Sequence, residues 1–79
     1  MKFEIELSEE QKRAIERSAP SHAAYLRINR VSGIYSGVST DALWFDCDDE
    51  LISSASKQVY IAISEINMPV NSWAMVNVN

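Results

Sequence analysis

The first twenty residues show two hydrophobic patterns, one after the other. Apolar and charged side chains alternate over residues 2–7, a period of two that predicts a half-buried strand. Ser8 then begins a predicted helix, because its hydroxyl can accept the amide hydrogen of Gln11 while the Gln11 side chain reaches back, as in a capping box. Pro20 disfavours helical backbone at the residue before it, so the helix should end near Ser18.

A second strand is predicted where aromatic and β-branched side chains gather over residues 25–31. Residues 22–26 also fit a single helical turn, and we favour the strand. The Ser-Gly pairs at 32–33 and 36–37 are turn signals beyond it.

The segment 39–56 allows two interpretations. Read as a helix capped by Ser39, it gathers one apolar stripe: Trp44, Cys47, Leu51, Ile52 and Ala55. Read otherwise, residues 42–45 form a short strand and a new helix begins at Asp48. Because the stripe holds over about three turns at 3.6 residues per turn, we predict a helix for most of the segment.

The last third of the chain predicts two strands. Residues 58–66 are β-branched and alternating, although Val59, Ile63 and Ile66 are also spaced for a helix. A break containing proline follows, and residues 72–78 then read as a final strand. We expect this strand to pair with 58–66 as a hairpin and to lie at an edge of the sheet.

These elements predict an α+β fold, a three- or four-stranded, mostly antiparallel sheet with two helices packed on one face. The chain has 79 residues, which suits a single small domain over 1–79, and its 47% apolar and 23% charged content is that of a globular protein. No apolar run reaches the ~20 residues of a bilayer span, and a single cysteine allows no internal disulfide. We therefore expect a cytoplasmic protein with no membrane partner.

Charge is distributed unevenly along the chain. Residues 1–30 carry a net charge of +1, whereas residues 31–79 carry −5, with Lys57 as their one base. Nucleic acids are bound by clustered Lys and Arg that neutralise phosphates, and the acidic part would repel them. We expect no direct nucleic-acid partner, and a basic protein surface as the natural electrostatic partner.

The inventory of chemically active residues is short. His22 is the one histidine, and Cys47 lies among aspartates that raise the pKa of a thiol and suppress the thiolate. The acids at 46–50 lack the glycine and the final glutamate of a calcium loop, and two glycines in the whole chain give no phosphate-binding motif. We expect no enzymatic activity, no metal and no cofactor.

One short stretch combines three pieces: Tyr-Ser-Gly at 35–37, Asp-Ala-Leu-Trp at 41–44 and Asp-Cys at 46–47. It resembles the run Tyr-Gly-x-x-x-Asp-Ala-Leu-Trp-Asp-Cys of the barstar family of ribonuclease inhibitors. The resemblance implies a helix whose aspartates, at the positions of Asp41 and Asp46, plug a basic active site. Ser36 and Phe45 are extra residues, and on a helix Phe45 would turn Asp46 about 100° away from Asp41.

The sequence thus predicts a non-enzymatic inhibitor that occludes a basic, phosphate- or nucleic-acid-handling surface of a larger protein. Phage-encoded anti-CRISPR inhibitors and immunity proteins act in this way, an analogy of class alone. Both interpretations of 39–56 leave four acids in solvent, and we expect these to bind the partner: Asp46, Asp48, Asp49 and Glu50. Asp41 is a fifth expected binding residue, and Tyr35 and Trp44 are the expected aromatic anchors. The alternative is an assembly module, acting as a homodimer or through edge-strand pairing by residues 72–78.

Overall fold

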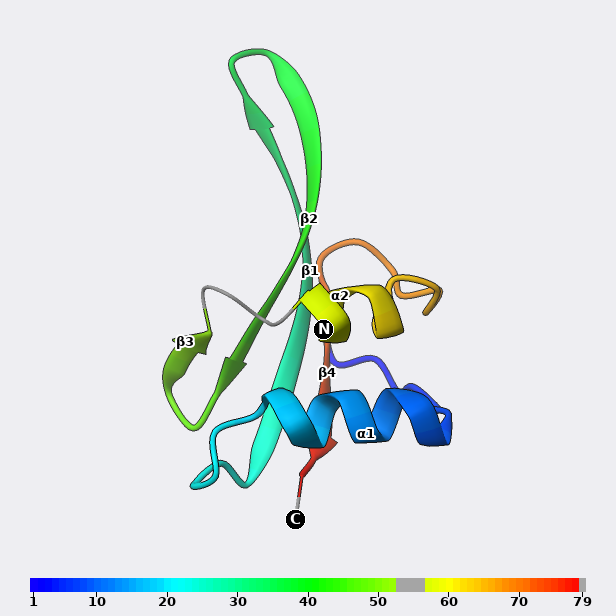
Figure 1. Cartoon of the computed structure of the whole chain (residues 1–79). Coiled ribbons are helices and arrows are strands. Elements are labelled where there is room, and N and C mark those ends of the chain that lie inside the picture. Colours follow the sequence, from blue (N-terminus) through cyan, green and yellow to red (C-terminus); the bar gives the residue numbers. More distant parts are fainter. Residues whose placement is uncertain (53–56, 79) are drawn as a thin grey trace.

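Four antiparallel strands form one sheet, and two helices pack on one of its faces (Figure 1). The computed structural model describes residues 1–52 and 57–78, and only the backbone at 34, 35, 39 and 40. The elements, in chain order, are α1 (Glu9–Ser18), β1 (Tyr25–Tyr35), β2 (Val38–Cys47), β3 (Glu50–Ile52), α2 (Lys57–Ile63) and β4 (Ser72–Asn77). Strand order across the sheet is β3-β2-β1-β4, which confirms the predicted α+β fold.

One face of the sheet and both helices build the hydrophobic core. Successive strand residues point to opposite faces, and those of one face, including Leu26, Ile28 and Phe45, are buried. Ile15 of α1 and Ile63 of α2 belong to the same buried cluster. Both helices therefore cover this face, which we call the core face.

Residues 2–7 do not form the predicted strand. Their contact with the sheet is a single parallel bridge between Lys2 and Trp73, with hydrogen bonds from Phe3 N to Trp73 O (2.6 Å) and from Trp73 N to Met1 O (2.9 Å). The predicted alternation does hold, since the apolar residues of the segment pack against the core while its charged residues are exposed. Packing of side chains, without a ladder of backbone bonds, thus fixes this segment.

Helix α1 begins and ends as predicted. Ser8 Oγ accepts a hydrogen bond from Gln11 N (3.2 Å) and Gln11 Oε1 accepts one from Ser8 N (2.8 Å), so the capping box is complete. The same glutamine donates from Nε2 to the carbonyl of Ala62 in α2, which ties the two helices together. Among the described residues, neither helix is long and apolar enough to cross a membrane.

Strand β1 is confirmed and is longer than predicted. The Ser-Gly pair at 36–37 is the two-residue turn into β2, with both residues at positive φ (52° and 78°), as a type I′ hairpin requires. The Ser-Gly pair at 32–33 lies inside β1, so that turn signal was wrong. The tip of the hairpin projects away from both helices (Figure 1).

The predicted helix over 39–56 is wrong, because β2 and β3 occupy its described part. The alternative was right about a strand at 42–45 and wrong about a helix from Asp48. Asp48 and Asp49 instead form a two-residue turn at positive φ (43° and 69°), a conformation that aspartate tolerates better than most residues.

The apolar stripe of that predicted helix divides between the two faces of the sheet. Cys47 and Ile52 lie on the core face, whereas Trp44 and Leu51 lie on the other. Ala55, the last residue of the stripe, lies outside the described residues. A spacing of three to four residues can therefore arise from two strands joined by a tight turn.

The predicted strand over 58–66 is also wrong, and the competing helical spacing was the better reading. Val59 and Ile63, one helical turn apart, are both buried in the core from α2. Strand β4 is confirmed, and it lies at an edge of the sheet as expected. It pairs with β1, so the predicted hairpin with 58–66 is not formed.

Candidate functional site

The predicted acidic residues do not share one surface. Asp41 and Asp46 both lie on β2, five positions apart, and so point to opposite faces of the sheet. The helix that the barstar resemblance implies for them is absent, since residues 38–47 are a strand. The structure therefore divides the acids into pairs and singles, each with its own surroundings.

Asp46 is buried against expectation, at 6% exposure. Its two carboxylate oxygens accept hydrogen bonds from Arg27 Nε and Nη2, both at 2.8 Å, in a bidentate pair across β1 and β2. Asn29 Nδ2 lies 3.5 Å from Asp46 Oδ2 and is buried beside it. Pairing a carboxylate with a guanidinium offsets the cost of removing it from water, so this charge is already used inside the protein.

Asp41 is likewise paired, at the sheet's other face. Arg30 Nη2 donates to Asp41 Oδ2 at 2.7 Å, and Arg30 Nη1 donates to the carbonyl of Met68 at 2.6 Å. The hydrogen bond from Arg30 lowers the pKa of Asp41 below its ordinary value of 3.8. Its carboxylate is thus ionised at neutral pH and neutralised by its neighbour.

The other three acids lie at the β2–β3 turn. Asp48 Oδ2 accepts a hydrogen bond from Ala24 N (2.9 Å), and Glu50 lies 3.5 Å from His22 Nε2. Asp49 and Glu50 are both exposed. Of the five predicted acids, Asp49 and Glu50 are the exposed ones that are not paired with Arg27 or Arg30, whereas Asp48 is half-buried.

The sheet face turned away from both helices, here called the open face, is only partly apolar. Its centre is the Arg27–Asp46–Asn29 cluster, and the Arg27 guanidinium carbon lies 5.9 Å from the centre of the Trp73 ring. Trp44 stands beside this cluster at 37% exposure. The exposed large apolar residues on this face are Val31, Val38, Trp44, Leu51 and Met75.

Tyr35, the second predicted anchor, ends β1 at the hairpin turn. Its side chain lies outside the described part of the structure. Trp44 is thus the predicted anchor that the structure places, and it is close to the exposed acids: one shallow hollow is lined by Arg27, Trp44, Asp46, Asp49, Glu50 and Leu51.

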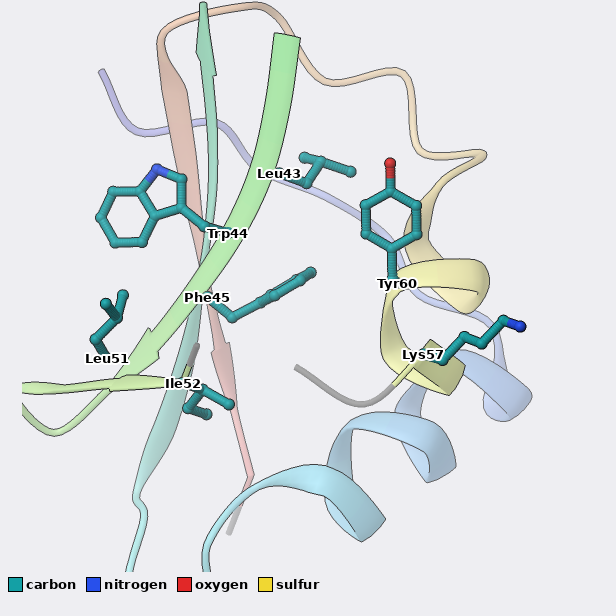
Figure 2. Close-up of a pocket in the computed structure, with 7 residues that line it drawn as sticks. All are labelled: Leu43, Trp44, Phe45, Leu51, Ile52, Lys57 and Tyr60. Carbon is teal, nitrogen blue, oxygen red and sulfur yellow. The ribbon is translucent and has the colours of Figure 1, made fainter. Parts of the chain in front are cut away.

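A groove of about 630 Å³ runs between β2 and α2 (Figure 2). Leu43 and Phe45 point into it from β2 and face Tyr60 of α2, while Trp44 and Leu51 point to the other side of the strand. This groove could not be predicted from a sequence in which 39–56 reads as a helix and 58–66 as a strand. The signal that could have revealed it is the helical spacing of apolar residues in 58–66. A helix there buries Val59 against the sheet and brings its neighbour Tyr60 beside β2.

Groups with catalytic potential are dispersed. Cys47 is buried, and burial first, then Asp48, Glu50 and Asp46, raises the pKa of its thiol. Within the residues that the structure describes, no three His, Cys, Asp or Glu side chains lie together in a way that could hold a metal ion. Comparison of the chain with protein-family models, curated proteins and solved structures gave no significant match.

Proposed function

We propose that this chain is a small, non-enzymatic antagonist that binds a basic surface of a larger protein and occludes it. One observation carries the proposal: exposed Trp44 and Leu51 stand on the open face directly beside the solvent-directed acids Asp49 and Glu50. Tryptophan is enriched at the energetic centres of interfaces, and acids at their rim attract basic partners. The net charge of −4 acts in the same direction.

The proposal assigns the five acids unequal roles. Arg27 is paired with Asp46, and Arg30 with Asp41. These two aspartates therefore shape the surface and contribute little net charge to it. Asp49 and Glu50, the exposed acids at the β2–β3 turn, supply the attraction. Trp44 and Leu51 supply apolar area that a partner removes from water.

An affinity pull-down from lysate of the source cell, with mass spectrometry, tests this function. The expected result is one stoichiometric partner with a basic surface, released at raised salt because exposed charges are screened. Asp49→Asn with Glu50→Gln should lower its recovery, and Trp44→Ala should lower it further. The matched control is Glu4→Gln with Glu6→Gln, the same charge change on exposed residues of the N-terminal segment. Equal loss from both double variants would contradict a role for the turn acids.

A second candidate is an assembly module that pairs with its own copy, and the exposed apolar side chains of the open face favour it. Sedimentation over a wide concentration range separates the two functions. The antagonist should remain a monomer of 8.9 kDa. A dimer that Trp44→Ala dissociates would instead support the assembly module.

A further inference from the structure

Among the residues that the structure describes, strand β2 has no partner on its outer side over residues 38–44, which we call its free edge. β1 pairs with residues 38–46 of β2, but β3 pairs only with residues 45–47, and no other strand in the described part of the chain lies on that side. The two-residue turn at 48–49 makes Cys47 and Glu50 a hydrogen-bonded pair, so the backbone N–H and C=O groups of Cys47 point toward β3. These groups point to alternate sides along a strand, and those of residues 39, 41 and 43 therefore point to the same side, away from β1. Such a row of groups is a template for another strand.

The opposite edge of the sheet is less available. Trp73 N and O on β4 already bond to Met1 O and Phe3 N of the N-terminal segment. The two edges therefore differ: the N-terminal segment partly covers β4, whereas β2 borders an apolar groove at residues 43–45.

That groove meets the unpaired edge of β2 at Leu43. Tyr60 and Leu43 line the main groove between β2 and α2, and both also line a second hollow that continues to the Arg30–Asp41 pair. Near Leu43, a strand added to β2 would direct alternate side chains into this groove and the remaining ones to the open face, beside Trp44. Backbone bonds would supply affinity and the two sets of side chains specificity.

The residues that line the groove and those beside Trp44 on the open face define the chemistry of the added strand. The groove is apolar apart from Lys57 at its rim, so it fits apolar side chains and disfavours cations. On the open face, the hollow beside Trp44 and Leu51 is lined by the Arg27–Asp46 ion pair and by Asp49 and Glu50. The pair is neutral, so the net charge of the hollow is negative and fits a Lys or Arg side chain. An extended segment that alternates apolar and basic residues is complementary to both sides.

A second copy of this chain fits the edge poorly. Two copies of the chain would bring together net charges of −4 each. A basic partner strand does not meet this obstacle.

We infer that the free edge of β2 takes up an extended, alternately apolar and basic segment of the partner protein as an added fifth strand. The inference rests on the proposed function and names the form in which the partner is bound. The segment lies antiparallel or parallel to 38–44, between Tyr60 on one side and Trp44 on the other.

Heptapeptides selected from a random displayed library against the full chain, and then synthesised, are the probes that test this. Apolar residues alternating with Lys or Arg are the expected consensus. Methylating the backbone nitrogen at every second residue, the set facing β2, should weaken binding at least about tenfold, while methylating the other set should not. A library that enriches no peptide, or binding indifferent to which set is methylated, overturns the inference.

Two variants of α2 provide a matched pair within the protein. Tyr60 and Ile61 are exposed to similar extents (49% and 59%), but only Tyr60 lines the groove. Tyr60→Ala should weaken the peptides about tenfold and Ile61→Ala should leave them unchanged. If the salt-sensitive partner is captured but neither Tyr60→Ala nor excess peptide reduces its recovery, strand addition fails and the antagonist function stands. If peptides bind as described and no basic partner exists, the proposed function fails.

Discussion

The two faces of this sheet are built from alternate residues of the same strands, yet they differ in how much apolar surface they leave exposed to water. On β2, Phe45 is 2% exposed in the core, while its neighbour Trp44 on the open face is 37% exposed. The core face is covered by two helices. The open face neutralises its buried charges internally and leaves aromatic surface in water. Folding alone accounts for the first face, whereas the second leaves apolar side chains exposed to water.

The sharpest test of this difference compares neighbouring residues. Phe45→Ala removes a fully buried ring and should lower the free energy of unfolding by about 3–5 kcal/mol. Trp44→Ala should cost less than half as much, because part of its ring is already in water. Denaturant unfolding followed by circular dichroism measures both. Equal losses would mean that the open face is as much a part of the core as the helix-covered one.

A smaller loss in the free energy of unfolding is expected when the ion pair of the open face is broken. Asp46→Asn removes the anionic partner of Arg27 and should cost about 1–2 kcal/mol, while Asp49→Asn, at an exposed turn position, should change stability by less than about 0.5 kcal/mol. A double-mutant cycle with Arg27→Gln isolates the pair's coupling energy. Coupling near zero would show that the bidentate pair contributes shape alone.

The smallest effect comes from the titration of Cys47 on the core face. Its thiol pKa is raised above the ordinary 9.0 in the folded protein, so the unfolded chain loses this proton first as pH rises. The stability contribution is therefore fully present below pH 9.0 and is lost as pH rises through the folded pKa. Unfolding measured from pH 7 to 10 should show this loss in the natural chain and less of it in Cys47→Ala. Parallel pH dependence in both chains would assign the loss to other groups.

Local signals in the sequence were enough where one residue pair decides an element. The Ser8–Gln11 capping box fixed the start of α1, and the Ser-Gly pair at 36–37 was a turn signal that proved to close the β1–β2 hairpin. In 39–56 the helical stripe was misleading, because the two-residue turn at 48–49 places residues of two strands at helix-like spacing. Reading 42–47 with a period of two, and Asp-Asp as a turn, would have separated the two faces.

The candidate site was only partly accessible to sequence reasoning for a related reason. Acidity and the aromatic anchor Trp44 were visible as composition. Which acids are neutralised depends on cross-strand pairs, Arg27 with Asp46 and Arg30 with Asp41, and these follow from register between strands far apart in the chain. The groove at Tyr60 depends on α2 packing beside β2. Neither follows from local propensity.

The strand order also divides the sheet by the length of chain that must close to form each pair. β1, β2 and β3 are consecutive and joined by two-residue turns, so their meander forms through short loops at small entropic cost. β4 meets β1 only after the chain through α2 has been brought back, with Tyr25 paired to Asn77. Contacts between residues so distant in sequence slow folding. Docking of β4, which places Ala74 against Ile28, is therefore the step expected to set the folding rate.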